Sequence, residues 1–271
     1  MHSLGTAARL DSLVRELFPA GPAQRESTRA TWPTLPYTIR LARTPRDLRA
    51  AVALRRQSYR RHFGPDFECE LEPADVQAGS LVFIAADKRD DAVIGTARFA
   101  TNRMQPLYIG SQLDLEPMFG NTHLADVHRL AVTSGTRGKL VKLGLFKATY
   151  LCAQALQVRH LVIGARSTLE RDYLRLGFGD PGGHRTMLET LGRPHRLLSL
   201  DIAAAERRWR EMQHPLYQFM VVDFHPDIDP FVGSTRRWID VRANDEEALL
   251  PSASLSGIST RAQDSLSREA G

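Results

Sequence analysis

Hydrophobic residues recur along the middle of the chain with two spacings, one typical of strands and one of helices. Residues 37–42 alternate apolar and polar side chains, which predicts a half-buried strand. Residues 80–86 and 92–100 predict the two strands of a hairpin, because both are largely apolar and a charged turn separates them. Residues 139–156 are apolar on most sides at helical spacing, which predicts a long, largely buried helix.

Further elements follow from the same patterns and from helix-end signals. Thr44, Pro45 and Asp47 make a typical helix start: a hydroxyl cap, a proline at the first helical position and an acid two residues later. We expect helices at 45–62, 169–176 and 204–212, strands at 124–132, 160–164 and 196–202, and a last apolar segment at 217–222. This order predicts an α/β fold with a mixed central β-sheet flanked by helices.

The two ends of the chain differ in composition from its middle. Residues 1–36 hold one short amphipathic stretch and then many Pro, Gly, Ser and Thr residues, so we expect a flexible N-terminal segment. Residues 243–271 are Ser-rich with few aromatic residues, which predicts a disordered tail. One domain is therefore expected over residues 37–242, with 195–242 as its C-terminal extension.

Composition narrows the class of protein. The 271 residues are 42% hydrophobic, enough for one sizeable core. No uncharged apolar run is long enough to span a membrane, and charges interrupt the stretch where a secretory signal would lie. Two cysteines, Cys69 and Cys152, give no disulfide framework, which indicates a cytoplasmic setting. Aromatic residues make up only 7% and no nucleic-acid-binding motif occurs, so we expect no nucleic-acid partner.

Basic residues form two clusters in a chain of net charge +5. One cluster lies between residues 55 and 61, and the other lies between Asp126 and Glu170, where no acidic residue occurs. Such clusters are either solvated helix faces or the flanks of a site for a phosphate group or an acidic protein surface.

The order of elements, the strand-to-basic-helix join at 132–145 and the segment at 173–178 (YLRLGF) resemble the GNAT acyltransferase superfamily. The resemblance implies a splayed strand whose backbone at Leu130, Ala131 and Val132 pairs with the pantetheine arm of the acyl donor. It also implies that the start of the next helix binds the donor's phosphates, as unpaired N–H groups and the helix dipole favour an anion. The residues concerned are Arg137, Gly138, Lys139 and Lys142.

The phosphate-binding segment departs from the superfamily pattern Q/R-x-x-G-x-G/A. Here Leu140 and Lys142 stand where the pattern has small residues, and their side chains would crowd the pyrophosphate of coenzyme A. A carrier-bound phosphopantetheine has only one phosphodiester, and the acidic surface of acyl carrier protein suits the basic clusters. We therefore expect acyl carrier protein as partner and acyl-ACP, or else acyl-CoA, as co-substrate, with no permanently bound cofactor.

Three short segments sharpen the resemblance. Residues 54–59 (LRRQSY) with Phe63-Gly64, residues 95–99 (GTARF) and residues 126–130 (DVHRL) resemble the acyl-homoserine-lactone synthases and the related N-acyl amino acid synthases. Pro65 stands where the homoserine-lactone enzymes usually have Trp, which favours the N-acyl amino acid synthases. Ornithine-acylating enzymes share the same skeleton. The implied function is a bacterial N-acyltransferase that transfers a fatty acyl group to the amine of an amino acid.

Such a reaction needs a base, because the acceptor amine is protonated near neutral pH. Asp126, acting through a water, is the candidate, and burial would raise its pKa toward the useful range. Alternatively, Asp126 and Arg129 form a structural ion pair. His128 shares a face of the strand with Asp126 and is the second candidate base.

Other residues have expected roles in binding and in proton transfer. Tyr173 lies where the superfamily often has a tyrosine that protonates the leaving thiolate, or else it only packs on the sheet. Arg55, Arg98 and Arg129 are expected to bind substrate, since a planar guanidinium binds a carboxylate through two hydrogen bonds. The apolar residues at 104–119 are either one wall of an acyl tunnel or a loop packed on the core.

Alternatives remain open at this point. No cluster has metal-ligand spacing, because His123 falls on the strand face opposite to Asp126 and His128, so we expect no metal. The rival functions are an acetyl-CoA-dependent GNAT N-acetyltransferase and a catalytically inactive GNAT-like module that binds an acyl ligand or a partner. A homoserine-lactone synthase would require S-adenosylmethionine. The amine, the acyl length and the oligomeric state are not predicted.

Overall fold

A computed structural model describes residues 34–228 apart from residues 78 and 191. Residues 1–33 of the predicted flexible segment (1–36) and all of the predicted disordered tail (243–271) lie outside the described residues. The strands are β1 (Tyr37–Leu41), β2 (Ser80–Asp87), β3 (Val93–Thr101), β4 (Leu124–Val132), β5 (His160–Arg166), β6 (Met187–Thr190) and β7 (Arg193–Asp201). The α-helices are α2 (Pro45–Phe63), α3 (Pro73–Val76), α4 (Glu116–Phe119), α5 (Gly135–Ala155), α6 (Ser167–Arg175) and α7 (Ile202–Glu211). Shorter helical segments are η1 (Ile109–Ser111), η2 (Pro181–Gly183) and η3 (Gln218–Val222).

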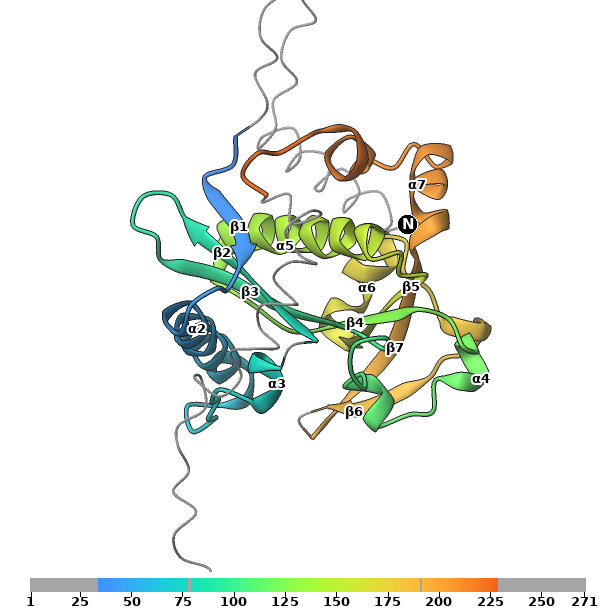
Figure 1. Ribbon diagram of the computed structural model, residues 1–271, viewed down its shortest axis with the longest axis horizontal. Coiled ribbons are helices and arrows are strands. Elements are labelled where there is room, and N and C mark those ends of the chain that lie inside the picture. The colour runs from blue at the N-terminus through green and yellow to red at the C-terminus, as the bar shows by residue number, and fades with distance from the viewer. Residues whose placement is uncertain (1–33, 78, 191, 229–271) are drawn as a thin grey trace, which may run out of the picture.

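The strands form a seven-stranded sheet in the order β1-β2-β3-β4-β5-β7-β6 (Figure 1). β4 and β5 pair in parallel, and every other neighbouring pair in this sheet is antiparallel. The α/β fold with a mixed central sheet is therefore confirmed. The boundary at residue 195, where we expected an extension to begin, falls inside strand β7 of this sheet.

Helices cover both faces of the sheet (Figure 1). On one face, Leu81 and Phe83 belong to the largest core cluster, together with Val141 and Leu145 of α5. On the other face, Val82 packs with residues of α2 and α3. β2 is buried along its whole length because successive side chains point to opposite faces and both faces are covered.

The start of α2 confirms the predicted cap. The Thr44 side chain accepts a hydrogen bond from the Asp47 amide, and the Asp47 side chain accepts one from the Thr44 amide. This reciprocal pair satisfies two N–H groups that the first turn of a helix leaves free. The helix ends at Phe63, and the N–H of Gly64 donates to the Arg60 carbonyl.

Several elements differ from the expectations. α3 and β6 were not predicted, because four residues are too few to show a hydrophobic period. α5 begins at Gly135 rather than at residue 139, so the whole predicted phosphate-binding segment lies in its first turns. β4 contains a bulge: Arg98 opposes His128 but Thr96 opposes Ala131, and Arg129 between them has a φ of 54°.

A gap opens in the sheet between β4 and β5. The two strands pair only from Leu124 to Asp126, the last pair being Asp126 with Val162. Beyond it, β4 continues to Val132 and β5 to Arg166, and no described residue of one strand pairs with the other. The splayed strand that the resemblance implied is therefore present, and it begins at Asp126.

Candidate active site

Asp126 lies at the base of this gap, on the sheet face that α2, α3 and η1 cover. Its side chain is fully buried, and Oδ2 accepts a hydrogen bond from the Ile109 amide at 3.3 Å. Oδ1 has no hydrogen-bond partner among the described residues. Burial raises the pKa of Asp126 to about 6, although backbone hydrogen bonds from Ile109 and Tyr108 oppose the rise. A carboxylate of this kind is partly protonated near neutral pH and can both accept and release a proton.

His128 lies beside Asp126, as predicted from their spacing, but it is already held by another side chain. Nε2 accepts a hydrogen bond from Nε of Arg98 at 2.7 Å, so the ring proton is on Nδ1. Nδ1 lies 3.9 Å from Oδ2 of Asp126, too far for a direct hydrogen bond. Burial, followed by the charges of Arg98 and Arg129, holds the pKa of His128 well below its ordinary value. The imidazole is therefore neutral, and its basic nitrogen faces a guanidinium.

The three arginines predicted to bind substrate gather around two carboxylates that we did not predict. Arg55 Nη1 and Arg98 Nη1 lie 2.7 and 3.0 Å from the same oxygen of Asp75. Glu72 pairs with Arg98 at 2.7 Å and with Arg129 at 2.6 Å. Burial raises the pKa values of Glu72 and Asp75, but the adjacent guanidinium groups outweigh it, so both pKa values are below their ordinary range.

These ion pairs decide whether Asp126 and Arg129 form a structural pair, and they limit how the arginines can bind a substrate. Arg129 pairs with Glu72 rather than with Asp126, so the Asp126–Arg129 ion pair is not formed. Arg55 and Arg98 are only 1% exposed, so they do not form surface salt bridges. Arg55 nevertheless keeps Nε and Nη2, one complete two-donor edge of its guanidinium, without a hydrogen-bond partner among the described residues.

One local sequence pattern involves Glu72 and Asp75. Glu72, Pro73 and Asp75 have the spacing of a helix start, and the carboxylate of Asp75 accepts the Glu72 amide at 3.1 Å. That signal locates a helical turn but does not identify its partners in α2, β3 and β4. Long-range pairing of this kind is set by the fold rather than by local spacing.

Tyr173 lies on α6, half-buried, with its ring 5.6 Å from the ring of Phe178. Burial raises the pKa of its phenol, and the charge of Asp172 and then the phenol of Tyr59 raise it further. Tyr59 in turn packs edge-on against Phe63 and Phe67. No described contact joins Tyr173 to Asp126 or His128, so its role in protonating a thiolate stays a prediction.

The predicted donor-binding residues follow the bulge of β4. Ala131 and Val132 pair with β3, and the Val132 carbonyl also accepts a hydrogen bond from Arg61 of α2 at 2.9 Å. Gly138 packs so closely that a Cβ there would lie 1.9 Å from the Thr133 carbonyl oxygen. A glycine is therefore required where α5 begins beside the end of β4.

Of the three cations in the same segment, two form ion pairs with carboxylates of the described residues and one does not. The side chain of Arg137 pairs with Asp87, and that of Lys142 pairs with Asp172 of α6 at 2.7 Å. Lys139 is exposed, and no carboxylate in the described part of the chain lies within ion-pair distance of it. Only part of the positive charge that the sequence concentrates here is thus free to meet an anion.

The apolar insertion packs on the core, which was one of the two alternatives. Leu107, Ile109 and Phe119 form a buried cluster with Leu124 and Val162. The insertion also contributes to the site, because its backbone amide at Ile109 binds Asp126. Whether an acyl chain contacts it stays a prediction.

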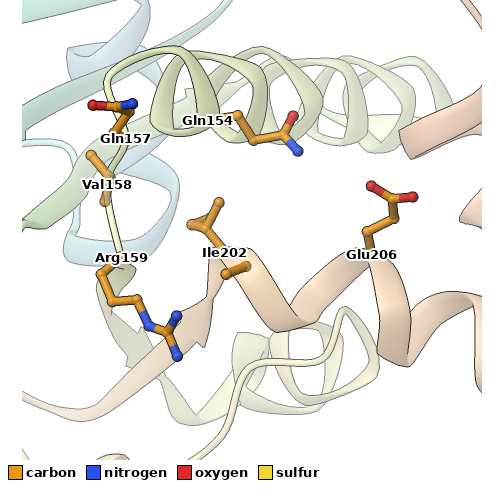
Figure 2. A pocket seen from close by; sticks show the side chains of 7 residues that line it. Gln154, Gln157, Val158, Arg159, Ile202 and Glu206 are labelled. Carbon is orange, nitrogen blue, oxygen red and sulfur yellow. The ribbon is translucent and has the colours of Figure 1, made fainter.

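A hollow of about 410 Å³ lies away from these residues, between the end of α5 and the start of α7 (Figure 2). Gln154 and Glu206 face each other across it. Glu206 pairs with Arg210, and Arg159 at the rim of the hollow pairs with Asp201.

In residues 34–228 as described, no three His, Cys, Asp or Glu side chains gather in a way that could hold a metal ion. Likewise, none of the described helices combines the length and hydropathy needed to cross a membrane.

Comparison with known proteins identifies a matching family and similar folds. Residues 50–201 match the model of a family described as N-acyl amino acid synthase FeeM. The fold is similar to that of FeeM, an N-acyl amino acid synthase from uncultured soil microbes, with a TM-score of 0.53 and 18% identity over 68% of this chain and 98% of that chain. The AHL synthase LasI is similar at a TM-score of 0.46 and 18% identity, over 62% and 93% of the two chains. A GNAT-family acetyltransferase from Staphylococcus aureus is similar at a TM-score of 0.42 and 11% identity, over 60% and 99%. No curated protein sequence matches the chain.

Proposed function

The chain belongs to the FeeM family of N-acyl amino acid synthases and is a GNAT-type N-acyltransferase, and on this basis we propose that it transfers a fatty acyl group from acyl carrier protein to the amine of an amino acid. The observation that carries the proposal is the fully buried carboxylate of Asp126, with a pKa of about 6, at the base of the gap between β4 and β5.

The chemistry requires that the acceptor amine lose a proton and attack the thioester carbonyl. Asp126 accepts that proton, directly or through a water, and its raised pKa brings it closer to the pH at which such a transfer is efficient. The tetrahedral intermediate then expels the pantetheine thiolate, which takes a proton to leave as a thiol. Tyr173 is the candidate donor of that proton. The amide bond forms without a covalent bond to the protein.

Arg55 supports an amino acid as the acceptor. Its unpartnered Nε and Nη2 form the parallel pair of donors that a carboxylate binds best. Its Nη1 contact with Asp75 fixes the orientation of the guanidinium. A buried guanidinium edge without a partner is costly, so an acceptor carboxylate bound there would supply the missing hydrogen bonds. Arg98 has all its nitrogens engaged with His128, Asp75 and Glu72, which makes it a support rather than a direct ligand.

Unpaired cations around the gap support a carrier protein as the donor. Among the described residues, no carboxylate lies within ion-pair distance of Arg61, Lys139 or Arg166. Arg61 and Arg166 both lie close enough to His62 to lower its pKa further after burial has lowered it. These cations suit the single phosphodiester and the acidic surface of an acyl carrier protein.

Mass spectrometry of lipid extracts from bacteria that express the protein tests the proposal. New N-acyl amino acids are expected, and they should be absent with Asp126→Asn, which keeps the shape of the side chain. Asp114→Asn is the matched control, because it makes the same chemical change in the exposed part of the insertion, where Asp114 only caps the Glu116 amide.

The purified protein should then use acyl-ACP and discriminate against acyl-CoA of the same chain. Equal or faster turnover of acyl-CoA would contradict the carrier-protein donor. The absence of any new lipid, with the protein folded and supplied with acyl-ACP and a panel of amino acids, would contradict the reaction itself.

A further inference from the structure

The ion pair between Lys142 and Asp172 joins the two helices that begin at the open end of the sheet gap. α5 follows β4 through a two-residue link, and α6 follows β5 directly. Lys142 lies about two turns into α5, and Asp172 lies within the first two turns of α6. Their side chains meet at 2.7 Å, and both are partly exposed to solvent.

A second carboxylate likewise forms an ion pair with another cation near the start of α5. Asp87, at the end of β2, pairs with Arg137 in the first turn of α5 and also with Arg89. Two of the cations that the sequence places at the start of α5 are therefore already neutralised. In this segment, the first-turn N–H groups of α5 and the exposed Lys139 remain to attract a phosphate.

From this arrangement we infer that Asp172 is a donor-selecting residue, which disfavours donors that carry more than one phosphate group. The inference rests on the proposed carrier-protein donor. Coenzyme A bears a pyrophosphate and a ribose phosphate, whereas carrier-bound phosphopantetheine bears one phosphodiester. With one phosphate bound at the first turn of α5, a further phosphate that lay along α5 toward Lys142 would meet the negative charge of Asp172 or have to displace it.

The size of the effect follows from elementary electrostatics. Two unit charges about 4 Å apart in a water-like medium interact by about 1 kcal/mol, which corresponds to about a fivefold change in a binding constant. Removal of the Asp172 charge also frees Lys142 to contact the additional phosphate. Because the pair is partly exposed, added salt should reduce the effect.

Isothermal titration calorimetry of the full chain with coenzyme A and with 4′-phosphopantetheine tests the inference. Asp172→Asn should tighten coenzyme A binding about fivefold at low salt, while the affinity for 4′-phosphopantetheine changes by less than about twofold. The double variant Lys142→Gln/Asp172→Asn should lose the gain, because the freed lysine is gone. Glu206→Gln is the matched control: it also removes one negative charge from an ion pair, but beside the hollow at the far end of α5.

Unchanged coenzyme A binding by Asp172→Asn would overturn the inference, and so would an equal gain for both ligands or a gain that persists in the double variant. Circular dichroism and a thermal melt verify that each variant is folded, and Asp172→Ala repeats the test if the amide disturbs α6. Failure here is distinct from failure of the proposed function. The donor proposal is tested by turnover of acyl-ACP against acyl-CoA in the unaltered protein, whereas this inference is tested by the ratio of two affinities in a variant.

Discussion

Nε of Arg98 donates to Nε2 of His128 at 2.7 Å, and this contact places the imidazole proton on the nitrogen nearest Asp126. The same guanidinium uses its other two nitrogens to bind Asp75 and Glu72. One side chain of β3 therefore fixes a histidine on β4 and two carboxylates at α3. The consequences of this and of the neighbouring contacts can be measured.

Arg98→Met should destabilise the fold strongly. It removes one partner from buried Asp75 and from Glu72, and loss of one member of a buried ion pair typically costs about 3–5 kcal/mol. Urea denaturation gives the free energy of unfolding. Arg89→Met is the control, because Arg89 pairs with Asp87 from an exposed position, where an ion pair contributes little to stability. Similar small losses in both variants would contradict the structural role of Arg98.

The rate of acyl transfer should depend on the ionisation of Asp126. Because its pKa is raised to about 6, kcat/KM should fall about tenfold per pH unit below that value and level off above it. A profile with no inflection between about pH 5 and 7 would contradict the assignment of Asp126 as the base.

Stability should show the opposite dependence on the same group. The Asp126 carboxyl ionises near its ordinary value of 3.8 in the unfolded chain but near 6 in the folded protein, so the folded state holds the proton more tightly. The contribution of Asp126 to stability therefore falls as pH rises from about 4 to about 6, by up to about 3 kcal/mol. Asp126→Asn removes this penalty, so above pH 6 it should be at least as stable as the unaltered protein while it loses activity. Thermal melts across this pH range measure the difference.

Arg55→Lys should weaken binding of the acceptor amino acid more than it slows turnover. The lysine keeps a positive charge near Asp75 but loses the Nε–Nη2 edge, so KM for the acceptor should rise about tenfold or more while kcat changes less. Arg56→Lys is the control at the adjacent position, where the guanidinium binds the Cys69 carbonyl. An equal rise in KM for both variants would show that the unpartnered edge of Arg55 does not bind the acceptor.

Gly138→Ala should disturb the start of α5. The new Cβ would lie 1.9 Å from the Thr133 carbonyl oxygen, which belongs to the backbone and cannot rotate away. We expect a loss of about 2 kcal/mol or more in stability and a raised KM for the acyl donor. Gly179→Ala is the control, because, apart from its two chain neighbours, no described residue has an atom within 4 Å of the position of its added Cβ.

The sequence predicted the elements that follow local rules. The cap at Thr44, the hairpin of β2 and β3, and strand β4 with Asp126 and His128 on one face are confirmed, because each follows from periodicity or from contacts a few residues apart. The preference for the N-acyl amino acid synthases over the homoserine-lactone enzymes, which rested in part on Pro65, agrees with the family match.

The parts that were not predicted depend on contacts across the fold. Nothing in the local sequence shows that Asp75 meets Arg55 and Arg98, or that the insertion turns its Ile109 amide toward Asp126. The bulge at Arg129 could not be predicted from the local sequence either, because it is a backbone conformation held by pairing with β3 and by the contact with Glu72. The roles assigned to the site residues stay predictions until the variants above are measured.

Asp75 uses its two carboxylate oxygens for different purposes: Oδ2 accepts the Glu72 amide that starts α3, and Oδ1 accepts both Arg55 and Arg98. A four-residue helix has almost no stability of its own. α3 is therefore held mainly by its contacts with the arginines of α2 and β3, and without α3 those arginines would lose their carboxylate partners. The turn of α3 and the paired arginines therefore depend on each other, and Glu72 of this turn meets Arg98 of β3 and Arg129 of β4. A change that unwinds this one short turn would thus remove both carboxylates that neutralise the arginines beside His128 and Asp126.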